Sequence, residues 1–200
     1  KNYLSTAHEA APIAITVEGA NIMTRNLIIF GQGAFRCHPF VLKEIEAVNL
    51  EDQTEAIEQF DIHFFNHIGY TITNAANSFV RGITDRFTDS PVVNESAAYY
   101  RQINRFSAAF AFLTDISMLV IGGSLKRKES ISARLGDVLS ALYLASTSLK
   151  YYEDTGNKES ELPLVHWTQK TLLHEAQEKI HQTLSNFPNK IVAILLGLII

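Results

Sequence analysis

The chain has 200 residues, of which 46% are hydrophobic and 19% charged, and its formal net charge is −4. This composition supports a sizeable buried core and argues against a disordered chain. A nucleic-acid-binding role is disfavoured, because no basic excess is present to neutralise phosphates. The single cysteine, Cys37, excludes an internal disulfide framework and fits a reducing compartment.

Both ends of the chain are expected to be cuts in a longer parent protein. The chain begins at Lys1, not Met, and it ends in the apolar run 191–200. Soluble chains seldom stop inside such a run, since exposed apolar surface is a liability. As a helix the run would be about 15 Å long, too short to span a bilayer. We expect it to pack on the other helices, with shallow membrane contact as the alternative.

Short helices are predicted in the first quarter of the chain. Apolar residues at helical spacing predict a helix over 20–30, and Gly31 or Gly33 suits its end. Pro39 suits the first turn of a second short helix, which we expect to run through Val48. The polar stretch that follows marks the expected boundary between a domain over residues 1–49 and a domain over residues 50–200.

Four long amphipathic helices are predicted after that boundary, at about 55–87, 99–121, 130–149 and 165–184. Short connectors between long helices favour an antiparallel bundle, and no sustained period-2 alternation indicates a sheet. The predicted fold class is therefore all-α. The side chains expected to be buried are Ile68, Ile72, Phe79, Phe106, Phe110, Leu113, Leu135 and Leu142.

Glu18 is the candidate catalytic residue. It follows apolar residues, precedes a predicted helix and is followed by Gly19. Apolar surroundings disfavour the charged form of a carboxylate, which suits a general base. Gly19 would let the backbone approach a ligand closely. The same residues also describe an ordinary acid near a helix start, where the helix dipole favours negative charge.

A series of motifs extends this observation over nearly the whole chain. The segment around Glu18 resembles the Glu-Gly element of acyl-coenzyme A dehydrogenases. Further stretches resemble the long bacterial members that act in fatty acid β-oxidation and carry an extra carboxy-terminal helical domain. These stretches are Arg25-Asn-Leu-Ile-Ile-Phe-Gly-Gln-Gly-Ala, Cys37-His-Pro, Gly122-Gly-Ser-Leu-Lys-Arg, Ile131-Ser-Ala-Arg-Leu-Gly-Asp-Val-Leu-Ser, Leu142-Tyr-Leu-Ala-Ser, Leu162-Pro-Leu-Val-His-Trp and Asn186-Phe-Pro-Asn.

The resemblance implies an FAD-dependent enzyme that oxidises a fatty acyl-CoA to the trans-2-enoyl-CoA. Glu18 matches the glutamate that removes the α-proton, while the β-hydrogen leaves as hydride to the flavin. Gly19 matches the glycine whose backbone contacts the substrate. Ala20, Asn21 and Ile22 match the triplet that contacts the flavin. Many members have threonine first and glutamine third in that triplet, so Ala20 and Ile22 can offer only backbone or apolar contacts.

The resemblance also implies partners and a location. We expect a fatty acyl-CoA substrate, an electron-transfer flavoprotein or similar acceptor, a homo-oligomer and no nucleic acid. A cytoplasmic location is expected, with peripheral contact to the inner membrane as the alternative. The fragment alone should be inactive, because the amino-terminal helical and middle β domains of the family supply most of the flavin and thioester site.

A second hypothesis is a non-catalytic helical module for oligomerisation or membrane association, and it suits residues 50–200, which show no catalytic motif. His63 and His67 are spaced to place two metal ligands on one helix face, but a third ligand is not evident, so no metal is predicted. Arg134 and Asp137 are expected to form a surface pair.

Overall fold

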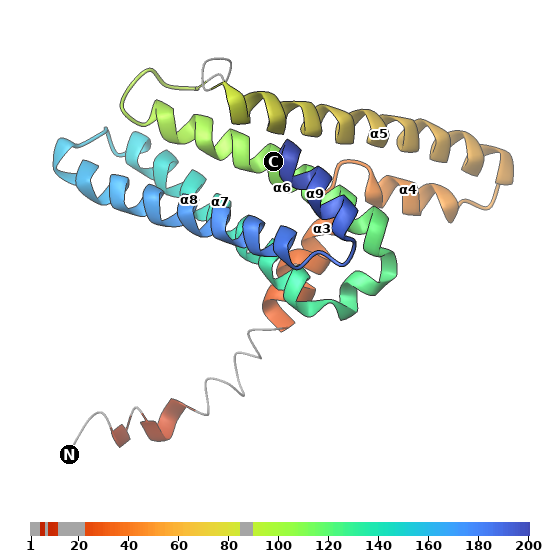
Figure 1. Cartoon of the computed structure of the whole chain (residues 1–200), viewed down its shortest axis with the longest axis horizontal. Coiled ribbons are helices and arrows are strands. Elements are labelled where there is room, and N and C mark those ends of the chain that lie inside the picture. Colours follow the sequence, from red (N-terminus) through yellow and green to blue (C-terminus); the bar gives the residue numbers. More distant parts are fainter. Residues whose placement is uncertain (1–4, 7, 12–22, 85–89) are drawn as a thin grey trace.

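The computed structural model describes residues 5–6, 8–11, 23–84 and 90–200, and within these ranges it contains helices and no strand (Figure 1). The predicted all-α fold is confirmed. The elements in chain order are the π-helix η1 (Thr24–Gln32), α3 (Gly33–Cys37), α4 (Val41–Val48), α5 (Gln53–Ile83), α6 (Ala97–Ile121), the 3-10 helix η3 (Gly122–Arg127), α7 (Glu129–Asp154), the 3-10 helix η4 (Glu159–Glu161), α8 (Leu162–Ser185) and α9 (Lys190–Ile199).

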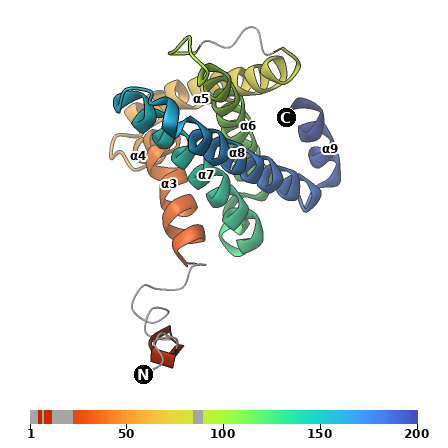
Figure 2. The same ribbon diagram turned by 90° about the vertical axis from the view of Figure 1, so that its left-hand side faces the viewer.

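The long helices form a bundle centred on α6 and α7. The helices α7 and α8 pack along each other, and so do α5 and α6 (Figure 1). The helix α6 joins these two pairs, because it also packs against α7 and α8. The π-helix η1 packs against α7, and α9 packs against α5 and α8 (Figure 2).

The core lies mainly between α6, α7 and α8. Leu113, Leu135 and Leu142 are buried as predicted, and Phe106 and Phe110 are partly buried. Each of these side chains lies on the apolar face that helical spacing predicts. Further core side chains from these helices and from their ends include Ile103, Phe112, Val138, Ala145, Leu149, Leu173, Ala176, Ile180 and Phe187.

The predicted face of α5 is wrong. Ile68, Ile72 and Phe79 are 41%, 63% and 46% exposed, so the apolar stripe of this helix is not part of the buried core. The side turned toward α6 carries polar residues instead, including His67 and the fully buried Ser78. Polar groups can be buried when partners satisfy them, and Asp115 of α6 is such a partner for Thr71 and His67. The Ser78 hydroxyl is buried without a hydrogen-bond partner among the described residues.

The helix that was expected to end at Gly31 or Gly33 continues to Cys37 as η1 and α3. The π-helical winding of η1 brings the Asn26 carbonyl close to Gly31. A Cβ atom on Gly31 would lie 3.0 Å from that oxygen. The glycine therefore permits the wide turn, and it does not end the helix.

Other helix ends follow ordinary capping rules. The side chain of Asp52 accepts hydrogen bonds from the backbone N–H groups of Thr54 and Glu55 at the start of α5. Gly122 ends α6 as predicted, with a φ of 57° that favours glycine. The helix α7 begins at Glu129, close to the predicted start, and it extends five residues beyond the predicted end.

Residues on both sides of the predicted domain boundary share one core. Phe30 of η1 is 3% exposed and belongs to the same cluster as Leu113 and Leu135. The linker between α4 and α5 is short, and these two helices pack against each other. The division into residues 1–49 and 50–200 stays a prediction.

Two apolar segments bear on the membrane alternative. One face of α9 packs on the bundle as expected, with Leu196 buried, while its other face leaves Ile191, Ile194, Leu195 and Leu198 exposed. The segment Ala97–Arg127 is long and apolar enough to cross a membrane by length and composition, but core helices of bundles meet the same criterion. Its helix α6 packs against three neighbours and buries Asp115.

The substitution Leu135→Ala should test the core directly, and Leu144→Ala on the same helix is its matched control. Leu135 is fully buried and Leu144 is 53% exposed. Leu135→Ala should lower the free energy of unfolding by about 2–5 kcal/mol, because it leaves a cavity. Leu144→Ala should change it by about 0.5 kcal/mol or less. Urea denaturation measures both values, and equal losses would contradict the orientation of α7.

Candidate functional site

The five residues that the sequence singles out for catalysis and binding lie outside the described residues. They are Glu18, Gly19, Ala20, Asn21 and Ile22. Their roles therefore stay predictions. The structure does describe the helix that follows them, and it describes a second polar cluster that sequence reasoning found only in part.

The first turn of η1 is fixed on α7 by charge. Arg25 Nε lies 2.7 Å from Asp137 Oδ1, and the Nη2 atom of the same arginine donates to Oδ2. Lys179 of α8 places its Nζ 3.1 Å from Asp137 Oδ2. The predicted surface pair between Arg134 and Asp137 is wrong, because Asp137 is occupied by two cations from other helices.

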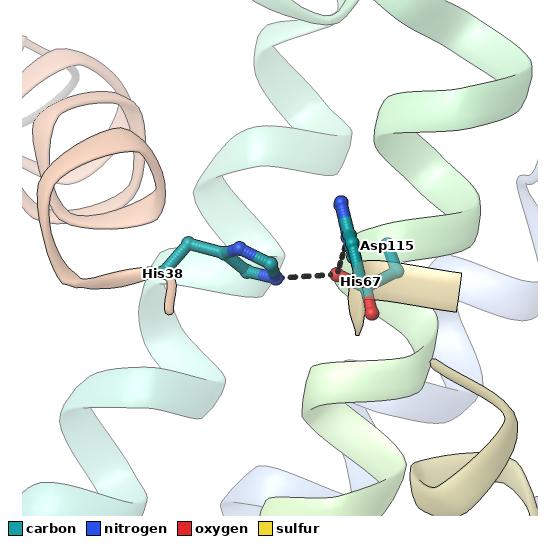
Figure 3. Close-up of side chains that lie close together, drawn as sticks. All are labelled: His38, His67 and Asp115. Atoms are coloured by element: carbon teal, nitrogen blue, oxygen red, sulfur yellow. Dashed lines mark hydrogen bonds and ion pairs between the residues drawn. The ribbon is translucent and has the colours of Figure 1, made fainter. Parts of the chain in front are cut away.

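His38 and Asp115 form the centre of the second cluster (Figure 3). His38 Nε2 lies 3.0 Å from Asp115 Oδ1, and both side chains are more than nine-tenths buried. On the other side of the ring, Nδ1 accepts the backbone N–H groups of Phe40 and Val41 at 3.2 and 3.1 Å. A nitrogen that accepts hydrogen bonds carries no proton, so the neutral ring holds its proton on Nε2 and donates it to Asp115.

His67 and Thr71 bring α5 into the same cluster. His67 Nδ1 lies 2.8 Å from Glu44 Oε1, and its Nε2 lies 3.6 Å from Asp115 Oδ1. Thr71 Oγ1 donates to Asp115 Oδ2 at 2.8 Å. The carboxylate of Asp115 therefore contacts side chains from α5 and from the loop before α4. Glu44 fixes the orientation of the His67 ring.

The cluster has the dimensions of a metal site but not its donor chemistry. One ligand atom from each of His38, His67 and Asp115 lies within 4.8 Å of the other two. A histidine that binds a metal normally donates its second N–H outward, as His67 can toward Glu44. His38 does the reverse, since its Nδ1 accepts two backbone N–H groups. Without His38 the set falls below the three protein ligands of a typical zinc site.

A cavity of about 790 Å³ lies beside this cluster. Apolar side chains from α5, α6 and α4 line most of it, including Ile68, Ile116 and Val41. The polar groups at its wall include the carboxylates of Glu44 and Asp115 and the side chain of Asn26. Both polar atoms of the Asn26 amide are buried and lack a protein partner, so water or a ligand in the cavity would satisfy them.

Sequence reasoning singled out one member of the cluster, His67, but not its partners. The spacing of the chain drew attention to His67 beside His63, whereas the structure places His67 next to Glu44 and Asp115. A signal for Asp115 was present, because this acid stands within the apolar run of α6 between Leu113 and Ser117. An acid at such a position requires a buried partner.

The tautomer of His38 can be measured by two-bond ¹H–¹⁵N correlation spectra. We expect a protonated Nε2 and an unprotonated Nδ1, because the backbone of α4 donates to Nδ1. Added Zn²⁺ should leave the His38 ring signals unchanged. A proton on Nδ1, or a shift of both the His38 and His67 rings on adding Zn²⁺, would contradict this assignment and indicate a metal site.

Comparison with known proteins supplies the family. No solved structure matches the chain. The family model described as acyl-CoA dehydrogenase, C-terminal, bacterial type, matches residues 35–200 and so covers α4 to α9 together with the cluster around Asp115. The match begins downstream of the predicted catalytic segment. With most of its length matched, the chain belongs to the bacterial-type acyl-CoA dehydrogenase C-terminal family.

Proposed function

We propose that the chain is the carboxy-terminal part of a flavin-dependent acyl-CoA dehydrogenase that oxidises fatty acyl-CoA to trans-2-enoyl-CoA in fatty acid β-oxidation. Family membership over residues 35–200 is the observation that carries this proposal. The Glu18-Gly19 pair supports it further, because it stands just upstream of η1 and within the series of motifs that resembles the family. The parent protein, and not the fragment alone, is the proposed enzyme.

Glu18 is the proposed catalytic base. Its carboxylate would take the proton from the α-carbon of the acyl thioester, and the hydrogen on the β-carbon would leave with its electron pair. The flavin of the parent enzyme supplies the acceptor for that hydride. An electron-transfer flavoprotein or a similar acceptor would then reoxidise the flavin. Gly19 is the proposed backbone contact to the substrate, and its missing side chain leaves room for that approach.

The described residues do not by themselves fit a flavin. The cavity beside α5 and α6 presents the carboxylates of Glu44 and Asp115, which would repel the pyrophosphate of FAD. The flavin contacts proposed for this chain are those of Ala20, Asn21 and Ile22, which lie outside the described residues. Most of the flavin site is therefore assigned to domains of the parent that precede this segment.

The substitution Glu18→Gln in the full-length protein should keep bound flavin but abolish most turnover. The amide is nearly isosteric with the carboxylate, yet it cannot accept the α-proton. The loss should exceed the roughly 10²–10⁴-fold typical of a general base. The rate of flavin bleaching by acyl-CoA under anaerobic conditions measures the step directly.

Glu9→Gln is the matched control, because Glu9 is exposed and precedes the proposed site. It should bleach at the wild-type rate. Bleaching at a near wild-type rate in Glu18→Gln would show that the base lies elsewhere. A wild-type protein that carries flavin but is not bleached by any acyl-CoA would overturn the proposed function itself.

The exposed face of α5 supports a second proposal, in which residues 50–200 also form an interface with a second copy of the chain. Large apolar side chains follow one side of the 31-residue helix, including Ile57, Phe65, Ile72 and Ile83, each more than half exposed. A helix of that length extends about 46 Å. Contiguous apolar surface on this scale marks an interaction site.

The charges of α5 favour a second copy over a membrane. Glu55, Glu58 and Asp61 lie in its first half, and Arg81, near its end, is its only Lys or Arg residue. Acidic residues would be repelled by anionic lipid headgroups. Arg81 is turned toward α6, where its Nη1 donates to the Asn104 carbonyl at 3.2 Å, so it does not add a cation to the apolar stripe. An antiparallel pair of α5 helices about a two-fold axis would bury the apolar stripes of both copies against each other.

The substitution Ile72→Lys should disrupt this interface. It places a charge on the exposed stripe, where it would be desolvated in the pair but solvated in the monomer. Light scattering after size exclusion of the full-length protein should show a lower mass than the wild type at the same concentration. Leu144→Lys, at an exposed position of α7, should keep the wild-type mass. An unchanged mass in Ile72→Lys, or vesicle binding that needs Ile72, would contradict the pairing.

A further inference from the structure

The backbones of η1 and α7 meet at a glycine. Gly136 is buried on α7, and a Cβ atom placed on it would lie 2.8 Å from the Arg25 carbonyl oxygen and 3.7 Å from Phe30 Cβ. Side-chain carbons do not approach a backbone oxygen so closely. Because the obstructing atom belongs to the backbone, no side-chain rotation relieves the clash. Any larger residue at this position would therefore push η1 away from α7.

An ion pair between side chains holds the same turn of η1 against α7. The Arg25 guanidinium contacts both carboxylate oxygens of Asp137, which restricts its orientation as well as its distance. Asp137 is only 14% exposed, so solvent screens this pair less than a surface pair. Lys179 adds a second cation from α8, and the carboxylate thereby links η1, α7 and α8.

The packing of η1 completes the attachment. Phe30, one turn further along, is buried in the core of the bundle, and Asn26 is buried beside it. Three independent contacts therefore hold the start of η1: a backbone approach, a two-point ion pair and an apolar anchor. The segment that contains Glu18 is joined to this start through the residues immediately before Thr24.

We propose that Gly136 and Asp137 are positioning residues for Glu18, through which the bundle of residues 50–200 contributes to proton abstraction without touching the substrate. This inference rests on the proposed function, in which Glu18 is the base. Proton transfer depends on placement, and a displacement of about 1 Å far from the reacting atoms can cost about 10²-fold in rate. The contacts of Arg25 determine where the chain that follows Glu18 begins its helix.

The test uses the full-length flavin-loaded protein with Gly136→Ala and Asp137→Asn. Gly136→Ala must displace η1, and we expect kcat to fall about 10- to 100-fold with little change in KM. Asp137→Asn keeps the size of the side chain but removes its charge, so we expect a smaller loss of about 3- to 10-fold in kcat. Asp137→Glu keeps the charge and should retain more activity than Asp137→Asn.

Two matched controls come from positions away from η1. Asp154→Asn removes an acid of the same helix that pairs with Lys150, and Gly197→Ala adds a Cβ atom where no other atom lies within 4 Å. Both should keep wild-type kcat. Two further readouts separate positioning from general damage: exchange of the substrate α-hydrogen with D₂O, which reports Glu18, and deuterium uptake by backbone amides of residues 23–32.

The expected result is that α-hydrogen exchange falls in parallel with kcat, while the flavin content of Asp137→Asn stays close to that of the wild type. Faster amide exchange confined to residues 23–32 would support the same inference. If Gly136→Ala fails to fold, Asp137→Asn and Asp137→Glu carry the test. Wild-type kcat and α-hydrogen exchange in Asp137→Asn, with Glu18→Gln inactive, would overturn the positioning role alone. A wild-type protein that neither exchanges nor oxidises acyl-CoA would overturn the proposed function with it.

Discussion

The approach of the Arg25 carbonyl to Gly136 is the constraint on which the arrangement of residues 24–48 depends. It sets the distance between η1 and α7, and the ion pair between Arg25 and Asp137 sets the direction of η1. From this start Phe30 enters the core, and the chain reaches α4 at the position where His38 meets Asp115. A bundle that lacked the glycine could not accept η1 at this distance.

Asp115 provides the second fixed point, and it explains the orientation of α5. Its carboxylate lies in the interior and needs donors, because an isolated buried charge is strongly unfavourable. His38 and Thr71 supply two of them, and His67 lies nearby. Since Thr71 and His67 belong to the polar side of α5, that side turns inward. The apolar side then stays largely exposed, with Ile68 and Ile72 at the wall of the cavity, and it is available for the proposed contact with a second copy.

The buried faces of the helices could be predicted from the sequence where hydrophobicity alone decides which face is buried. On α6 and α7 the apolar face is the buried face, so helical spacing alone predicted Leu113, Leu135 and Leu142. It failed on α5, because spacing identifies an apolar stripe but does not reveal that buried hydrogen bonds select the opposite side. Nor could it reveal that Asp137 pairs with Arg25 rather than with Arg134, since that pairing joins residues distant in the chain. The extent of η1 was missed for a local reason, because Gly31 permits a π-helical turn and was interpreted as a helix end.

Under the proposed function, the segment around Glu18 carries the chemistry, and the helical bundle holds the helix η1 that follows this segment. An experimental structure of the full-length flavin-loaded protein with a bound acyl-CoA would test this most directly. We expect the Arg25 carbonyl to lie against Gly136, the Arg25 guanidinium on Asp137, and the Glu18 carboxylate beside the α-carbon of the acyl chain. A structure in which Glu18 reaches the α-carbon while η1 is detached from α7 would contradict the central claim.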